Sequence, residues 1–166
     1  MILRTFLAQM LVFVVAAPAY ADGCRLDHAT YVEARSGAEI QFRPKDPATD
    51  AALTTGQFEL RLPHVTAPLA GDVTWNAGRN ARPDGAIARP CGTEEDAEGG
   101  RCWLWTGNVF TLDGTGAGLL DSAEMAAPKA LLFSDFGRAL AMMPAFVEAN
   151  PESGAFDVFT LNACKA

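Results

Sequence analysis

The chain of 166 residues is poor in the residue types that most often carry out catalysis. It has two histidines, His28 and His64, and four cysteines, no two of which stand in a C-x-x-C spacing. This argues against a zinc site and against a thioredoxin-like redox site. No serine stands in G-x-S-x-G, so the nucleophile motif of α/β-hydrolases is missing too.

Positive charge is also scarce. The chain has 13 Lys and Arg against 20 Asp and Glu, a formal net charge of −7. Phosphate backbones and anionic lipid heads repel such a chain. Because no basic stripe with interleaved aromatic residues occurs either, nucleic acid is not expected as a partner.

Long apolar runs are confined to the N-terminus. Arg4 precedes the apolar run from Phe6 to Ala17, and Ala19-Tyr20-Ala21 offers the small residues that a signal peptidase requires. We therefore expect a secretory signal peptide over residues 1–21. The alternatives are an uncleaved membrane anchor and a lipoprotein modified at Cys24.

Cleavage after the leader would leave residues 22–166 as a single domain, with 12 basic against 20 acidic residues once Arg4 is removed, a net charge of −8. Nothing in this part is apolar over the roughly 20 residues that a membrane helix needs. The mature protein is expected to be soluble, acidic, and periplasmic or secreted.

Four cysteines in an exported chain predict two disulfides, with three possible pairings. Cys91 and Cys102 flank a short glycine-rich loop, which costs little entropy to close. Cys24 and Cys164 lie near the two ends of the mature chain. We favour the pairs Cys91–Cys102 and Cys24–Cys164.

Period-two alternation predicts β-strands. Residues 56–62 place Phe58, Leu60 and Leu62 on one face and polar residues on the other. The remaining predicted strands are residues 29–34, 39–43, 72–76, 103–106, 108–112 and 155–162, with a turn at Gly107-Asn108. Without a βαβ rhythm, this pattern favours an α+β, predominantly antiparallel β fold, a sandwich or a barrel.

One short helix is expected in the C-terminal half. Ser134 is suited to its N-cap, Phe136, Leu140 and Met143 form an apolar stripe, and Pro144 would end it. Such a helix is typical of a plug at a barrel end or a cover over a sheet edge.

Three long segments are expected to be connections: residues 44–56, 76–90 and 114–129. Residues 76–90 carry arginines that could grip a carboxylate or phosphate, although pairing with neighbouring acids is the simpler alternative. A ligand site here would use Trp75, Asn76, Arg79, Asn80, Arg82 and Arg89.

A partial calcium-loop register begins at the end of the 108–112 strand. Asp113, Thr115, Asp121 and Glu124 fall at positions 1, 3, 9 and 12 of the chelating pattern, but Ala117 offers no oxygen at position 5. The alternative is a glycine-rich surface loop. No other cofactor is indicated.

The carboxylates between Cys91 and Cys102 pose a similar choice. They could converge on a cation, but adjacent carboxylates repel one another and charge runs are usually solvated. We therefore expect a solvated loop whose ends are joined by the disulfide. The acidic residues are Glu94, Glu95, Asp96 and Glu98.

These features together are typical of a small exported bacterial protein. The favoured function is a non-enzymatic binding or accessory module that acts on an envelope component or another exported protein. A small hydrolase using His64 with a carboxylate, and a calcium-dependent module, are the alternatives, and whether the protein is an enzyme stays open. Trp75, Trp103 and Trp105 could line a sugar cleft, but tryptophans in alternating strands more often lie in the core.

Overall fold

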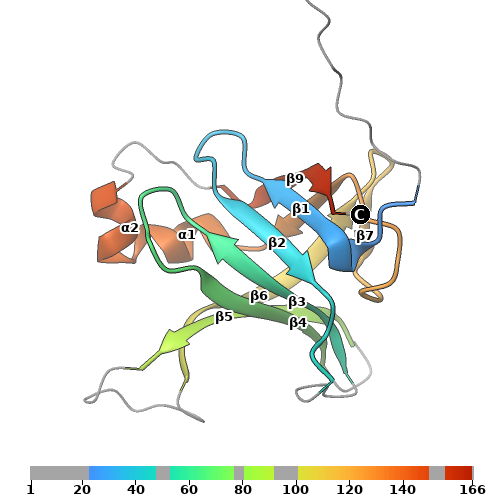
Figure 1. The fold of residues 1–166 in the computed structure, drawn as a ribbon, viewed down its shortest axis with the longest axis horizontal. Coiled ribbons are helices and arrows are strands. Elements are labelled where there is room, and N and C mark those ends of the chain that lie inside the picture. Colours follow the sequence, from blue (N-terminus) through green and yellow to red (C-terminus); the bar gives the residue numbers. More distant parts are fainter. Residues whose placement is uncertain (1–22, 48–52, 77–80, 92–100, 150–155, 166) are drawn as a thin grey trace, which may run out of the picture.

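The strands of the protein close into a barrel (Figure 1). The computed structural model describes residues 23–47, 53–76, 81–91, 101–149 and 156–165. Every strand pairing in these ranges is antiparallel, and eight strands follow one another in the order β1-β2-β3-β4-β5-β6-β8-β9 and back to β1. The predicted antiparallel α+β fold is therefore confirmed, in its barrel form.

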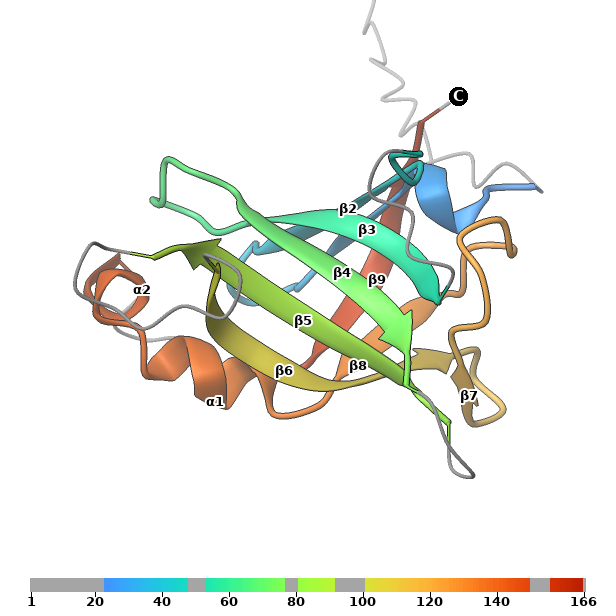
Figure 2. The ribbon, with the colours of Figure 1, turned by 90° about the horizontal axis from the view of Figure 1, so that it is seen from below.

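The strands are β1 (Ala29–Val32), β2 (Glu39–Arg43), β3 (Thr54–Arg61), β4 (Leu69–Trp75), β5 (Pro83–Pro90), β6 (Arg101–Leu112), β7 (Ala117–Leu119), β8 (Ala130–Phe133) and β9 (Val158–Cys164). The helices are a 3-10 turn η1 (Leu26–His28), α1 (Phe136–Ala141) and α2 (Pro144–Ala149). In Figures 1 and 2, α1 and α2 lie at one end of the barrel, and β7 lies at the opposite end.

Aromatic rings fill the interior. Each ring comes from a different strand or from α1, and neighbouring ring centroids are 5.4 to 6.0 Å apart. Each such pair contributes roughly 0.5–1.5 kcal/mol beyond its buried area. The described interior is therefore a packed core, made chiefly of Tyr31, Phe42, Phe58, Trp105, Phe133, Phe136 and Phe159.

The turn expected at Gly107-Asn108 is wrong, because β6 runs through both residues. The glycine serves close packing: a Cβ at Gly107 would lie 2.7 Å from the carbonyl oxygen of Ser134 and equally close to the Trp105 ring. Beyond Asn108, β6 pairs with β8 from Val109 onward. Only the tertiary contact explains why this position is glycine.

A β-bulge separates the environments of two tryptophans on β6. Ile87 pairs with Trp105, but the next residue, Ala88, pairs with Trp103, so Leu104 is the extra residue. Because of this extra residue, Trp103 and Trp105 point to opposite faces of the sheet, although residues two apart in a regular strand share a face. Trp105 is buried, as expected of a core residue, whereas Trp103 is 45% exposed.

Three strands lie in segments whose pattern did not reveal them. β5 lies within the expected connection 76–90, because its Pro83 and Pro90 stand at the strand ends and Gly85 makes room for Trp105 and Val109. The short strand β8 follows the connection 114–129, which itself contains β7.

The predicted helix is present as α1, but its cap differs. Asp135 occupies the N-cap in a left-handed conformation, φ 56°, and the Ser134 hydroxyl instead accepts a hydrogen bond from the backbone of Asn108. The carboxylate of Asp157 accepts from the N–H of Gly137 at 2.7 Å. α1 ends at Ala141, so Met143 of the predicted stripe lies beyond it. Pro144 instead begins α2, since proline is well suited to a first helical turn.

Both predicted disulfides are confirmed. Cys24 joins Cys164 with their Cα atoms 5.8 Å apart, and Cys91 joins Cys102 with their Cα atoms 5.1 Å apart. The first connects the segment before η1 to the end of β9, and the second connects the ends of β5 and β6. The carboxylates at 94–98 lie outside the described residues.

Candidate functional site

The described surface is hollowed at the place where β7 follows β5 along one edge of β6. β5 pairs with β6 as far as Asp84 opposite Asn108, and β7 takes over at Leu119 opposite Phe110. β8 occupies the other edge of β6. The interrupted edge leaves a cavity of about 370 Å³, which we call the notch and which is lined by Ala81, Arg82, Phe110, Ala117, Gly118 and Leu119.

The walls of the notch are apolar. Phe110 is half buried, because its neighbours Val109 and Thr111 point into the barrel and the alternation turns it outward. Leu119 is 38% exposed, unusual for a large aliphatic side chain. Ala117 and Gly118 are too small to fill the space beside it.

The charged group at the rim is Arg82, and polar contacts hold its backbone in place. The N–H of Arg82 donates to Oδ1 of Asn76 at 3.0 Å, and its carbonyl oxygen accepts from the N–H of Asn76 at 3.1 Å. Asp84 accepts from Nδ2 of Asn76 at 2.7 Å and from Nδ2 of Asn108 at 2.6 Å. Asp84, the carboxylate nearest to Arg82 in the sequence, thus pairs with amides. The Arg82 guanidinium contacts no acid among the described residues.

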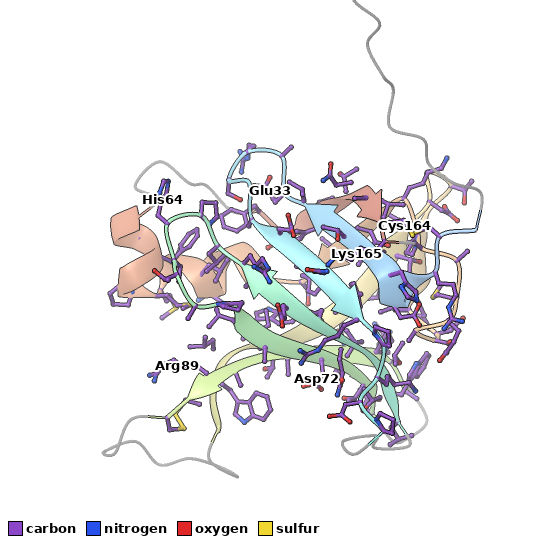
Figure 3. The ribbon with its side chains drawn as sticks, viewed as in Figure 1. Glu33, His64, Asp72, Arg89, Cys164 and Lys165 are labelled. Carbon is purple, nitrogen blue, oxygen red and sulfur yellow. A yellow bond between two sulfur atoms is a disulfide. The ribbon has the colours of Figure 1, made fainter. Side chains whose placement is uncertain are left out.

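The arginine-rich ligand site predicted from the sequence is divided by the structure. Arg82 precedes β5, and Arg89 lies near its other end, at the helix end of the barrel (Figure 3). The seven residue steps between them, at about 3.3 Å each along a strand, place their backbones about 23 Å apart. Asn76 is hydrogen-bonded to Arg82 and so lies at the same end of β5. Trp75 is half buried at the end of β4. Arg79 and Asn80 lie outside the described residues.

The loop considered for calcium does not have an EF-hand-like form. Oδ1 of Asp113 accepts from the N–H and hydroxyl of Thr115, and these bonds lower the pKa of Asp113. Glu124 pairs with Ser122, and β7 occupies the middle of the loop, ahead of Asp121. Across the described ranges, no three His, Cys, Asp or Glu side chains are grouped so that they could hold a metal ion.

The histidines lie apart from the notch. His64 is exposed, in a left-handed conformation with φ 65°, in the loop between β3 and β4 at the helix end of the barrel (Figure 3). Of the carboxylates in the described ranges, none is bonded to its ring. Nε2 of His28 lies 3.7 Å from Asp27, which is held more closely by Arg25 at 2.6 Å.

Sequence reasoning found Arg82 and Asn76 but not Phe110 or Leu119. Phe110 could have been found, because alternation along 108–112 places it on the outer face. Leu119 carries no such signal, since its partner on β6 is set by a pairing between distant strands.

Comparison with known proteins leaves the site to be judged on its geometry. No protein-family model matches the chain, and neither a curated protein nor a solved structure is significantly similar to it. Within the described ranges, every helix is too short or too polar to span a bilayer.

Proposed function

We propose that the protein is an exported, non-enzymatic binding module of the bacterial cell envelope whose ligand occupies the notch. The observation that carries this proposal is the contrast between a filled interior and a hollowed rim. Small eight-stranded barrels either fill their interior with side chains or keep room for a ligand. Here the rings of Phe58, Phe133 and Phe159 occupy the middle, so a ligand is bound outside.

The chemistry of the notch supports binding. Ligand sites are concave and mostly apolar, with a few placed polar groups, and they range over about 300–1,000 Å³. The residues that line the notch include the aromatic Phe110, the aliphatic Leu119 and one basic residue, Arg82. At about 370 Å³ it suits a small molecule or a single side chain.

Two disulfides support export. Such bonds persist in oxidising compartments and are rare in the cytosol. Intact mass of the protein recovered from the cell envelope tests this part of the proposal. We expect a chain beginning at Asp22, four hydrogen masses below its reduced form. Recovery of a full-length chain with free thiols from the cytosol would contradict export.

Filling the notch tests the binding site. Ala117 is exposed, so Ala117→Phe places a ring in the cavity without entering the core. Ala141→Phe is the matched control, since Ala141 is equally exposed at the far end of the barrel. With the uncharged dye Nile red, we expect the wild type and A141F to give the same blue shift and A117F to lose it. Equal binding by all three proteins would reject the notch.

A further inference from the structure

The notch combines apolar walls with a guanidinium that no described acid neutralises. From this combination we infer the class of its ligand: a monocarboxylate joined to a compact apolar group, such as a single ring or a short chain. The carboxylate pairs with Arg82, and the apolar group lies between Phe110 and Leu119. This inference rests on the proposed function and gives it a substrate class.

Arg82 is available because Asp84, the acid nearest to it in the sequence, is engaged elsewhere. Both oxygens of Asp84 accept amide hydrogen bonds, Oδ2 from Asn76 and Oδ1 from Asn108. In a chain with 20 acidic and 13 basic residues, an arginine without an acidic partner in the described structure is the group best placed to balance an incoming anion. A guanidinium presents two parallel N–H groups, the arrangement that fits a planar carboxylate.

Hydrogen bonds hold the backbone of Arg82 itself in place. Its two hydrogen bonds with Asn76 fix the residue beside the end of β5, so binding a ligand costs less conformational entropy than ordering a free loop would. A surface ion pair alone contributes little in water. The apolar walls must therefore supply much of the affinity, which is why the ligand needs both parts.

A pair of matched ligands tests the class. 4-Phenylbutyrate and 4-phenylbutan-1-ol share a ring and a chain but differ in charge, and each can be titrated into the ¹⁵N-labelled oxidised protein by NMR. We expect both to shift the amides of Phe110 and Leu119, with the acid binding about five-fold more tightly, as one exposed charge-assisted contact allows.

Arginine variants identify the charge that matters. Arg82→Gln is expected to remove the preference for 4-phenylbutyrate over the alcohol. Arg82→Lys keeps the charge but not the planar guanidinium, and it is expected to retain part of the preference. Arg89→Gln removes the same charge from the other end of β5 and should leave the preference intact. Leu119→Ala should weaken the binding of the acid and the binding of the alcohol by the same factor.

The outcomes separate this inference from the proposed function. If the wild type binds the acid and the alcohol equally, or if R89Q abolishes the preference and R82Q does not, the assignment of a carboxylate at Arg82 is wrong while the notch remains a binding site. If neither compound shifts the amides of the notch although Nile red still binds there, the ligand class is wrong. Loss of Nile red binding as well rejects the proposed function itself. Unchanged melting temperatures establish that each variant is folded.

Discussion

Trp105 donates its indole N–H to the backbone carbonyl oxygen of Ser134 at 2.9 Å. The Ser134 hydroxyl accepts from the N–H of Asn108 at 2.9 Å, and the N–H of Ser134 donates to the carbonyl oxygen of Asn108 at 3.0 Å. Three hydrogen bonds therefore join the middle of β6 to the junction of β8 and α1. Gly107 lies between them with no room for a side chain. This junction lies where β6 continues through the turn that its sequence suggests, and it joins α1 to the core.

The two tryptophans of β6 are expected to differ sharply in their contribution to stability. Trp105→Ala removes a buried ring and should lower the free energy of unfolding by about 3–5 kcal/mol. Trp103→Ala removes a ring that is nearly half exposed and should cost about 1 kcal/mol or less. Urea denaturation of both variants measures the difference. Similar costs would mean that the bulge does not turn Trp103 outward.

Gly71 on β4 is expected to tolerate no side chain. A Cβ there would overlap the ring of Phe58, so Gly71→Ala should destabilise the protein by about 1–3 kcal/mol. Gly116 is the control, because a Cβ there meets nothing within 4 Å, and Gly116→Ala should change stability by no more than about 0.5 kcal/mol. Thermal unfolding compares them. A neutral Gly71→Ala would show that Phe58 packs elsewhere.

The disulfides should contribute unequally. Their cysteines are 140 and 11 residues apart, and the chain-entropy model gives about 5 kcal/mol for the long loop and about 3 kcal/mol for the short one. The double variant Cys24→Ala/Cys164→Ala should therefore unfold at lower denaturant than Cys91→Ala/Cys102→Ala. The reverse order, measured by guanidinium denaturation, would contradict a mainly entropic contribution.

Glu33 should make stability depend on acid pH. Its burial alone would raise its pKa, but hydrogen bonds from Ser36 and from the N–H of Arg35 outweigh burial and lower it. A lowered pKa in the folded state means that the stabilisation is complete above the pKa of the unfolded chain, near 4.3, and is lost as the pH falls through the folded value.

Glu33→Gln tests this dependence. At pH 7 the substitution should cost about 1–2 kcal/mol, the range for hydrogen bonds to a charged acceptor. At pH 3 the difference from wild type should shrink, because wild-type Glu33 itself begins to be protonated. Urea denaturation at both pH values provides the comparison, and an equal difference at pH 7 and pH 3 would refute the role given to the carboxylate.

Strands with one solvated face could be predicted from the sequence, because their alternation is a local signal. Phe42 and Phe58 are buried as their spacing requires. The strands that could not be predicted are β5, where Pro83, Gly85 and Pro90 suggest a connection, and β7 and β8, which are too short to show a period. For β5 and β8, the contacts that favour a strand come from residues far along the chain.

The candidate site was predictable only in part. Arg82 and Asn76 could be identified as scarce positive charge and amides in one loop, but Arg89 could not be separated from them, since the sequence does not show that a strand lies between Arg82 and Arg89. Phe110 and Leu119 become neighbours only because β7 replaces β5 along β6.

The sequence by itself determined the antiparallel β-rich class and favoured the disulfide pairs that the structure contains, since alternation and cysteine spacing are properties of the chain. The tertiary structure decided that the sheet closes into a barrel, that Trp103 and Trp105 face opposite ways, and that Arg82 meets an apolar hollow. Closure, bulges and notches depend on how distant strands pair, and that pairing is settled by packing the aromatic rings into one core.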